Sequence, residues 1–182
     1  MKNIIPIKIR PHGEFAAYIR KSPGRKLTPQ EIMEFYKEIK AGKCKQVAKE
    51  HNLITNIGRT FLGNVLAAAN ESGGNPQVLE KIKYGNGTDT PILGDEDLKG
   101  STVYENDSFS AVEGTGTAVV DFLGYIAYSS GNDLVISEAG IYISFYAAWD
   151  PNLFARCLFT NPWTKTDEQD AMIIYTLTLS AV

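Results

Sequence analysis

The sequence predicts a mainly β fold of the α+β class: an antiparallel β-sandwich with two helices, preceded by an extended basic arm and helix. Three observations predict it. After residue 74, six segments rich in Val, Ile, Thr, Tyr and Phe are separated by turn residues. No long helical pattern interrupts these segments, so antiparallel pairing is more economical than a βαβ sheet. Before them stand two amphipathic helical patterns and a stretch broken by Pro and Gly.

The first 26 residues are predicted to be a basic arm. From Lys2 to Lys26 there are seven basic residues and one acid, Glu14, together with three prolines and two glycines. Short apolar pieces in this stretch can pair as edge strands, but they cannot form a core alone. We expect the arm to become ordered on a neighbouring subunit, because contacts with a partner offset the entropy lost on ordering.

The first helix is predicted over residues 28–41. Thr28 supplies an N-cap hydroxyl, Pro29 takes the first helical position, and Glu31 can return the capping bond. Apolar residues then form one stripe, and Gly42 ends the helix. The stripe consists of Ile32, Phe35, Tyr36 and Ile39.

Residues 44–54 predict a weak strand, and a second helix is expected from Thr55 or Asn56 to Gly73. The predicted β segments are residues 78–84, 109–112, 117–128, 134–144, 153–160 and 172–180. These elements suggest two parts: the arm and first helix in residues 1–50, and the second helix with the sandwich in residues 51–182.

Composition limits the function. The 182 residues include 43% hydrophobic ones, enough for one good core, and the longest apolar runs are far below the roughly 20 residues that cross a bilayer. We expect a soluble chain made in a cytoplasm, with Cys44 and Cys157 as free thiols. Residues 1–49 carry 12 Lys and Arg against 4 Asp and Glu, a net of +8, whereas residues 50–182 carry −11. Such a chain can bind nucleic acid, or the basic part of one copy can meet the acidic part of another.

The loop after the first β segment contains "GNGTDT" but neither phosphate-binding pattern. The lysine of a P-loop and the third glycine of a dinucleotide loop are both missing, so we interpret the glycines as a chain reversal. The acids that follow can bind calcium or form a solvated loop, and the absence of the EF-hand pattern favours the loop. They are Asp89, Asp95, Glu96 and Asp97.

Catalytic and metal-binding patterns are not found, so we predict no enzymatic activity, no metal and no cofactor. His12 and His51 are the only histidines, and neither cysteine stands beside one in sequence. Glu138 interrupts an apolar segment, "VISEAGIYIS". Its carboxylate can point outward, or it can be a buried latch that accepts hydrogen bonds from a neighbouring loop.

Four motifs in one order resemble a group of tailed-bacteriophage structural proteins, best represented by the N-terminal domain of tail-collar and tail-fibre proteins. The matching stretches are "NLITNIGRTFLGNVLAA" (52–68), "IKYGNGTDTPILGDEDL" (82–98), "ISEAGIY" (136–142) and "LFARCLFTNPWTKTDEQDAMIIYTLTL" (153–179). The resemblance covers about two thirds of the chain. The arm and first helix lie outside it, and no repetitive fibre shaft follows.

The resemblance implies assembly rather than turnover. It suggests a tail, collar, connector or fibre-attachment subunit of a virion, assembled in the host cytoplasm as a homo-oligomer and bound to other virion proteins. A capsid decoration protein and a carbohydrate-binding receptor module are the alternatives. The glycan reading requires exposed aromatics such as Tyr146, Trp149 or Trp163, and a hydrolase would require Asp121 and Glu138 in one cleft.

The predicted partner-binding residues are the basic side chains of the arm. Nucleic acid is a weaker partner for them, because the whole chain has a pI of 5.4 and shows no nucleic-acid motif. The residues are Lys8, Arg10, Arg20, Lys21, Arg25 and Lys26.

Overall fold

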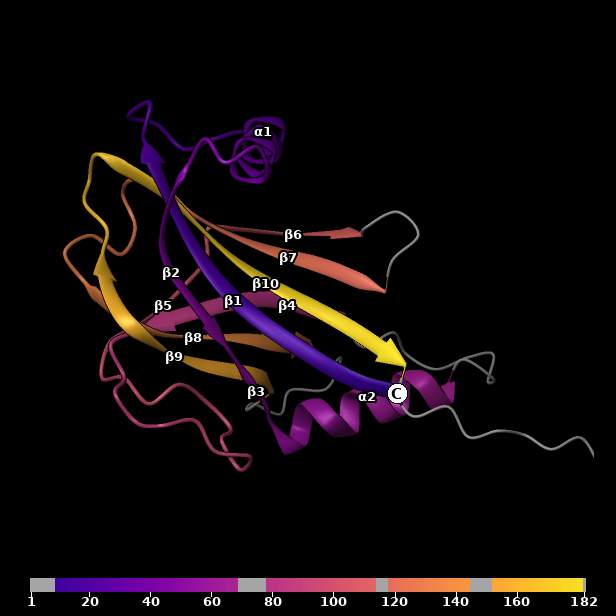
Figure 1. Cartoon of the computed structure of the whole chain (residues 1–182). Coiled ribbons are helices and arrows are strands. Elements are labelled where there is room, and N and C mark those ends of the chain that lie inside the picture. The colour runs from indigo at the N-terminus through magenta and orange to yellow at the C-terminus, as the bar shows by residue number, and fades with distance from the viewer. Residues whose placement is uncertain (1–8, 69–77, 114–117, 145–151, 182) are drawn as a thin grey trace, which may run out of the picture.

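Two five-stranded antiparallel sheets pack face to face in the computed structural model, which describes residues 9–68, 78–113, 118–144 and 152–181 (Figure 1). The predicted class, mainly β with two helices, is confirmed. The first sheet has the order β2-β1-β10-β7-β6, formed by Lys45–His51, Ile9–Lys21, Gln169–Ala181, Val119–Ile126 and Ser108–Glu113. The second sheet has the order β3-β9-β8-β4-β5, formed by Leu53–Ile54, Leu153–Thr164, Val135–Ser144, Val78–Gly85 and Val103–Glu105.

The main core lies between the sheets and a second one lies under a helix. Phe15 of β1, Tyr175 of β10 and Phe154 of β9 meet in the main core, where the Phe15 and Tyr175 ring centroids are 4.8 Å apart. Helix α1 (Pro29–Lys40) covers the outer face of the first sheet. Helix α2 (Asn56–Ala68) packs on β9, with Phe61 edge-on to Phe154. The fold therefore has a helix–sheet–sheet layering that buries both faces of the first sheet around β7 and β10.

Helix α1 begins as predicted. The Thr28 hydroxyl accepts from the Glu31 N–H, and the Glu31 carboxylate accepts from the Thr28 N–H at 2.9 Å, which completes the capping box. Gly42 follows the helix with φ +70°, a conformation that favours glycine. Local chemistry alone determines both ends of this helix.

Asp121 of β7 anchors α1 to the first sheet. Its carboxylate accepts from the Tyr36 hydroxyl at 2.6 Å and from the Thr176 hydroxyl at 2.6 Å, and it lies 2.6 Å from the Lys40 ammonium. Burial opposes ionisation of Asp121, but these donors outweigh it and hold the pKa below that of an ordinary aspartate. The ionised form is therefore the one that the fold stabilises.

This anchor predicts a pH dependence. A carboxyl with a lowered folded-state pKa stabilises the fold above its unfolded pKa of about 3.9, and that contribution is lost as the pH falls through the folded value. Asp121→Asn should lower the free energy of unfolding at pH 7 by about 1.5–3 kcal/mol. Urea titrations at neutral pH and near pH 3 should show that the variant loses less stability on acidification than the natural chain does. An equal loss in both proteins would contradict the role of Asp121.

The N-terminal segment is not an arm over its described part, and this corrects our expectation. Residues 9–21 form β1, which pairs with β10 along its whole length, from Ile9 opposite Ala181 to Lys21 opposite Gln169. Phe15 and Ala17 are fully buried in the main core. The strand was not predicted because its basic side chains suggested an arm, and because the strand that pairs with it along its whole length lies at the other end of the sequence.

Pro11 fits within β1 because the strand is an edge at that point. Strand β2 pairs with β1 only from Glu14 to Ile19, and the last contact is the Asn52 N–H donating to the Gly13 carbonyl. Alternate residues of a strand direct their backbone groups to the same neighbouring strand. The backbone of Pro11 therefore points, like that of Gly13, to the side on which β2 no longer pairs with β1. The missing N–H of proline therefore costs no ladder bond.

The boundary that we expected at residue 50 falls inside β2. Strands β1 and β2 complete the sheet that contains β7 and β10, so the described residues before and after position 50 share one sheet. Strand β5 was not predicted, and β9 continues four residues beyond the predicted end, to Thr164. The expected end of the second helix at Gly73 lies outside the described residues.

Candidate functional site

Of the two alternatives for Glu138 in β8, an outward-pointing carboxylate or a buried latch, the structure shows the buried latch. It is fully buried, and its carboxylate accepts three backbone N–H groups: Gly87 at 3.1 Å, Lys99 at 3.1 Å and Gly100 at 2.7 Å. These donors stand at both ends of the loop that joins β4 to β5. A Cβ added to Gly87 would lie 2.3 Å from a Glu138 oxygen, so glycine is required there by close approach. One carboxylate thus closes a long loop onto the second sheet.

Arg156 of β9 neutralises Glu138 and extends the same cluster. The guanidinium is fully buried and lies 2.8 Å from Glu138 Oε2, 2.9 Å from Asp95 Oδ2 and 2.8 Å from the Asp89 carbonyl. It spans two acids and one carbonyl, a use that suits the planar fork of arginine better than lysine. We refer to Arg156, Glu138 and Asp95 as the buried ion cluster.

Asp95 belongs to this cluster rather than to an ion site. Burial opposes its ionisation, but the Ile92 N–H at 3.0 Å and the Arg156 guanidinium hold its pKa below the usual value. Glu96 and Asp97 are exposed. Within the described residues no group of three or more His, Cys, Asp and Glu side chains is arranged to hold a metal. Asp95 therefore serves as an internal partner of Arg156.

Two further motif residues, Thr55 and Lys165, also have internal partners. The Thr55 hydroxyl donates to the Leu153 carbonyl at 2.5 Å and accepts from the Gly58 N–H at 3.1 Å, which fixes the start of α2 on β9. In the closing hairpin, the buried Lys165 ammonium donates to the carbonyls of Tyr128 and Thr166, at 3.0 and 3.2 Å. The four motifs that carry the resemblance therefore hold the fold together.

The groups considered for catalysis are not assembled into a site by these contacts. Asp121 binds α1 on the outer face of the first sheet, whereas Glu138 is enclosed in the second sheet. Cys157 is fully buried, and burial raises the pKa of its thiol, which disfavours the nucleophilic thiolate. Trp163 is only 6% exposed and is unavailable for stacking on a sugar, and Tyr146 and Trp149 lie outside the described residues.

The predicted partner-binding residues are divided between two places. Arg20 and Lys21 are the last residues of β1, and Arg25 and Lys26 lie in the short segment between β1 and α1. Arg10 lies toward the opposite end of β1. Lys8 is outside the described residues. The described members of this set therefore do not form one surface.

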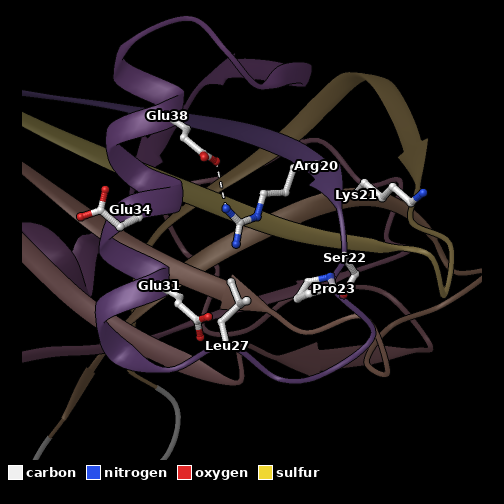
Figure 2. Close-up of a pocket in the computed structure, with 8 residues that line it drawn as sticks. All are labelled: Arg20, Lys21, Ser22, Pro23, Leu27, Glu31, Glu34 and Glu38. Atoms are coloured by element: carbon white, nitrogen blue, oxygen red, sulfur yellow. Dashed lines mark hydrogen bonds and ion pairs between the residues drawn. The ribbon is translucent and has the colours of Figure 1, made fainter.

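Figure 2 shows the pocket between β1 and α1, where acids of the same chain meet these bases. Arg20 lies 2.9 Å from Glu38 and 4.3 Å above the Phe35 ring. Arg25 forms a two-pronged pair with Glu31, whose pKa this pairing lowers to about 2. Much of the positive charge here is therefore balanced within the subunit.

Charges from the two halves of the chain also meet inside one molecule. Lys26 lies 3.8 Å from Asp107, and Lys40 lies 2.6 Å from Asp121. These pairs reduce the charge that is left for a neighbour. The uneven charge along the sequence is thus only a partial guide to contacts between subunits.

Sequence reasoning missed Arg156, the centre of the buried ion cluster. A signal was present: Arg156 interrupts the apolar run "LFARCLF" just as Glu138 interrupts "VISEAGIYIS". Opposite charges within two apolar strands predict a buried pair, because an unpaired buried charge is strongly disfavoured.

Comparisons with protein-family models, with curated sequences and with solved structures give no match to this chain. Among the described residues, neither helix has the length and apolar character needed to span a bilayer.

Proposed function

We propose that this chain is a non-enzymatic structural subunit of a tailed-phage virion, acting in the tail, collar, connector or fibre attachment by binding neighbouring virion proteins. The carrying observation is the buried ion cluster. Its members come from three of the four motifs that suggested the virion group: Asp95 from the second, Glu138 from the third and Arg156 from the fourth.

The buried ion cluster supports an assembly role because its charged motif residues bind one another inside the fold. Glu138 and Arg156 are fully buried; they bind each other and the β4–β5 loop. A site that turned over a substrate would need such groups accessible. A chain that fixes long loops on a rigid sandwich instead presents a surface of constant shape, which suits binding.

Assembly through a folded surface differs from assembly through an arm. Since β1 is already ordered in its own subunit, no ordering entropy over residues 9–21 has to be offset on contact. Self-association and binding to other virion proteins would then depend on the exposed parts of the sandwich. Exposed charges in such contacts make association weaker at high salt.

Locating the chain in intact particles tests the proposal. Purified virions should contain the protein, and cryo-electron microscopy should place its sandwich density in the tail, collar or connector in a fixed copy number. Density on the capsid lattice would instead identify a decoration protein. Absence of the protein from purified particles, with the chain present in infected cells, would overturn the proposal.

A further inference from the structure

A groove forms on one side of the sandwich where the chain changes sheets. Strand β2 is an edge of the first sheet and β3 is an edge of the second, and only Asn52 separates them. The chain crosses between sheets at this residue, leaving the first residues of β1 without a neighbour on that side. The resulting groove has a volume of about 610 Å³.

The groove brings together the only two histidines of the chain and two arginines. Arg10 and His12 come from β1, His51 from the end of β2, and Arg59 from the first turns of α2; all four are exposed. The segments are far apart in sequence, and the register of β1 against β2 makes them neighbours. Arginine and histidine are good donors to carboxylate and phosphate oxygens.

No acidic residue lines this groove in the described part of the chain. Glu14, which is opposite His51 across the two strands, is engaged by Lys49 at 2.9 Å. Arg10 and Arg59 have no carboxylate of the described residues within ion-pair distance, unlike Arg20 and Arg25 at the other end of β1. Within the described residues, the positive charge of this groove is therefore not balanced.

The remaining walls add an apolar character. Pro11, Leu53 and Ile54 line the groove beside the charged groups. Pro11 also has no N–H to offer an added strand on this edge, so side chains rather than backbone pairing would hold a ligand. Cationic groups beside an apolar wall fit a segment in which carboxylates alternate with aliphatic side chains.

We propose that this groove is a docking site for an acidic, partly aliphatic segment of a neighbouring virion protein. The inference rests on the proposed function, since that function supplies the neighbour. Arg10 and Arg59 bind carboxylates of the segment, His12 and His51 donate further hydrogen bonds, and Leu53 with Pro11 contacts its aliphatic side chains. Among the predicted partner-binding residues that the structure describes, only Arg10 belongs to this site.

The test uses the full chain and a short capped peptide that alternates Glu with Leu. In an NMR titration at low salt, this peptide should shift the amide signals of residues 10–13 and 51–54. The counterpart with Gln in place of Glu should bind much more weakly. Arg10→Gln with Arg59→Gln should raise the dissociation constant about tenfold or more, because both charge-assisted contacts to the carboxylates of the peptide would be lost.

Lys21→Gln with Lys43→Gln is the matched control, since it removes the same charge from exposed positions outside the groove. It should change the dissociation constant less than about twofold, an effect of long-range charge alone. Equal effects of the two pairs, or equal binding of the Gln peptide, would overturn the proposal. Stronger competition by inorganic phosphate or a single-stranded oligonucleotide would assign the groove to a phosphate ligand and also overturn it.

The two proposals fail in different ways. A chain found in virions whose groove does not bind the acidic peptide would refute the docking site alone. A chain that binds the peptide but is absent from virions would refute the virion role alone.

Discussion

Replacing Arg156 by Met should lower the free energy of unfolding by about 3–5 kcal/mol, the largest effect expected of any single substitution considered for this chain. The guanidinium is fully buried between Glu138 and Asp95. Met occupies a similar volume but leaves the buried Glu138 carboxylate without its cation, so that Glu138 would have to take up a proton or draw in water. Asp95 would keep only the Lys99 ammonium, at 3.3 Å. Urea unfolding followed by circular dichroism measures the loss.

Arg25→Met is the matched control, because Arg25 also forms a close pair with a glutamate but lies on the surface. Solvent screens that pair, so the control should unfold close to the natural chain. If Arg156→Met changed the unfolding midpoint no more than Arg25→Met does, the buried ion cluster would not be holding the loop and the argument from it would fail.

Gly58→Ala should destabilise the chain by about 1–3 kcal/mol even though alanine favours helices more than glycine. A Cβ at Gly58 would lie 2.1 Å from the Phe154 carbonyl oxygen. That atom is backbone of β9, which is held on both sides, so α2 itself would have to move away. The displacement would weaken the contact between Phe61 and Phe154. Thermal and urea unfolding measure the effect.

Gly63→Ala in the same helix provides a control of opposite sign. Gly63 is exposed, and an added Cβ would meet nothing within 4 Å. The substitution should therefore stabilise the chain by about 0.5–1 kcal/mol through reduced freedom of the unfolded state. Two variants that shift stability in the same direction would show that α2 is not docked on β9 at Gly58.

Local chemistry made part of the fold predictable. The capping box of α1 involves only Thr28 and Glu31, so its sequence signature is complete. Six of the seven later strands follow from β-forming residues between turn residues, and β10 shows the clearest alternation. In each case the information lies within a few neighbouring residues.

Strand β1 could not be predicted, because the information that determines it does not lie within a few neighbouring residues. Pro11 and Gly13 break the local pattern, and the strand exists because β10, whose residues lie 148 to 172 positions later, pairs with it along 13 residues. Gly13 is itself explained only in three dimensions, since an added Cβ would lie 2.2 Å from the Asn52 side chain. Positive charge on the exposed side chains of a strand was mistaken for evidence of an arm.

The buried ion cluster and the groove could not be predicted for the same reason. Glu138 was recognisable as unusual, but its partners Gly87, Gly100 and Arg156 lie between 18 and 51 residues away. The groove depends on the exact register that places His51 beside β1, and a shift of one residue would turn the side chains to the other face. A site that sheet pairing assembles from distant segments cannot be predicted from any one of those segments.

Hydrogen–deuterium exchange of the dilute protein tests most directly whether the chain is one cooperative unit that uses its own charged motifs internally. The amides of Ala16, Ala17 and Ile19 in β1, and those of Gly87 and Gly100 that donate to Glu138, should exchange as slowly as the amides of β10. Fast exchange throughout β1 together with protection of β10 would contradict this account, because β1 would then be an arm after all.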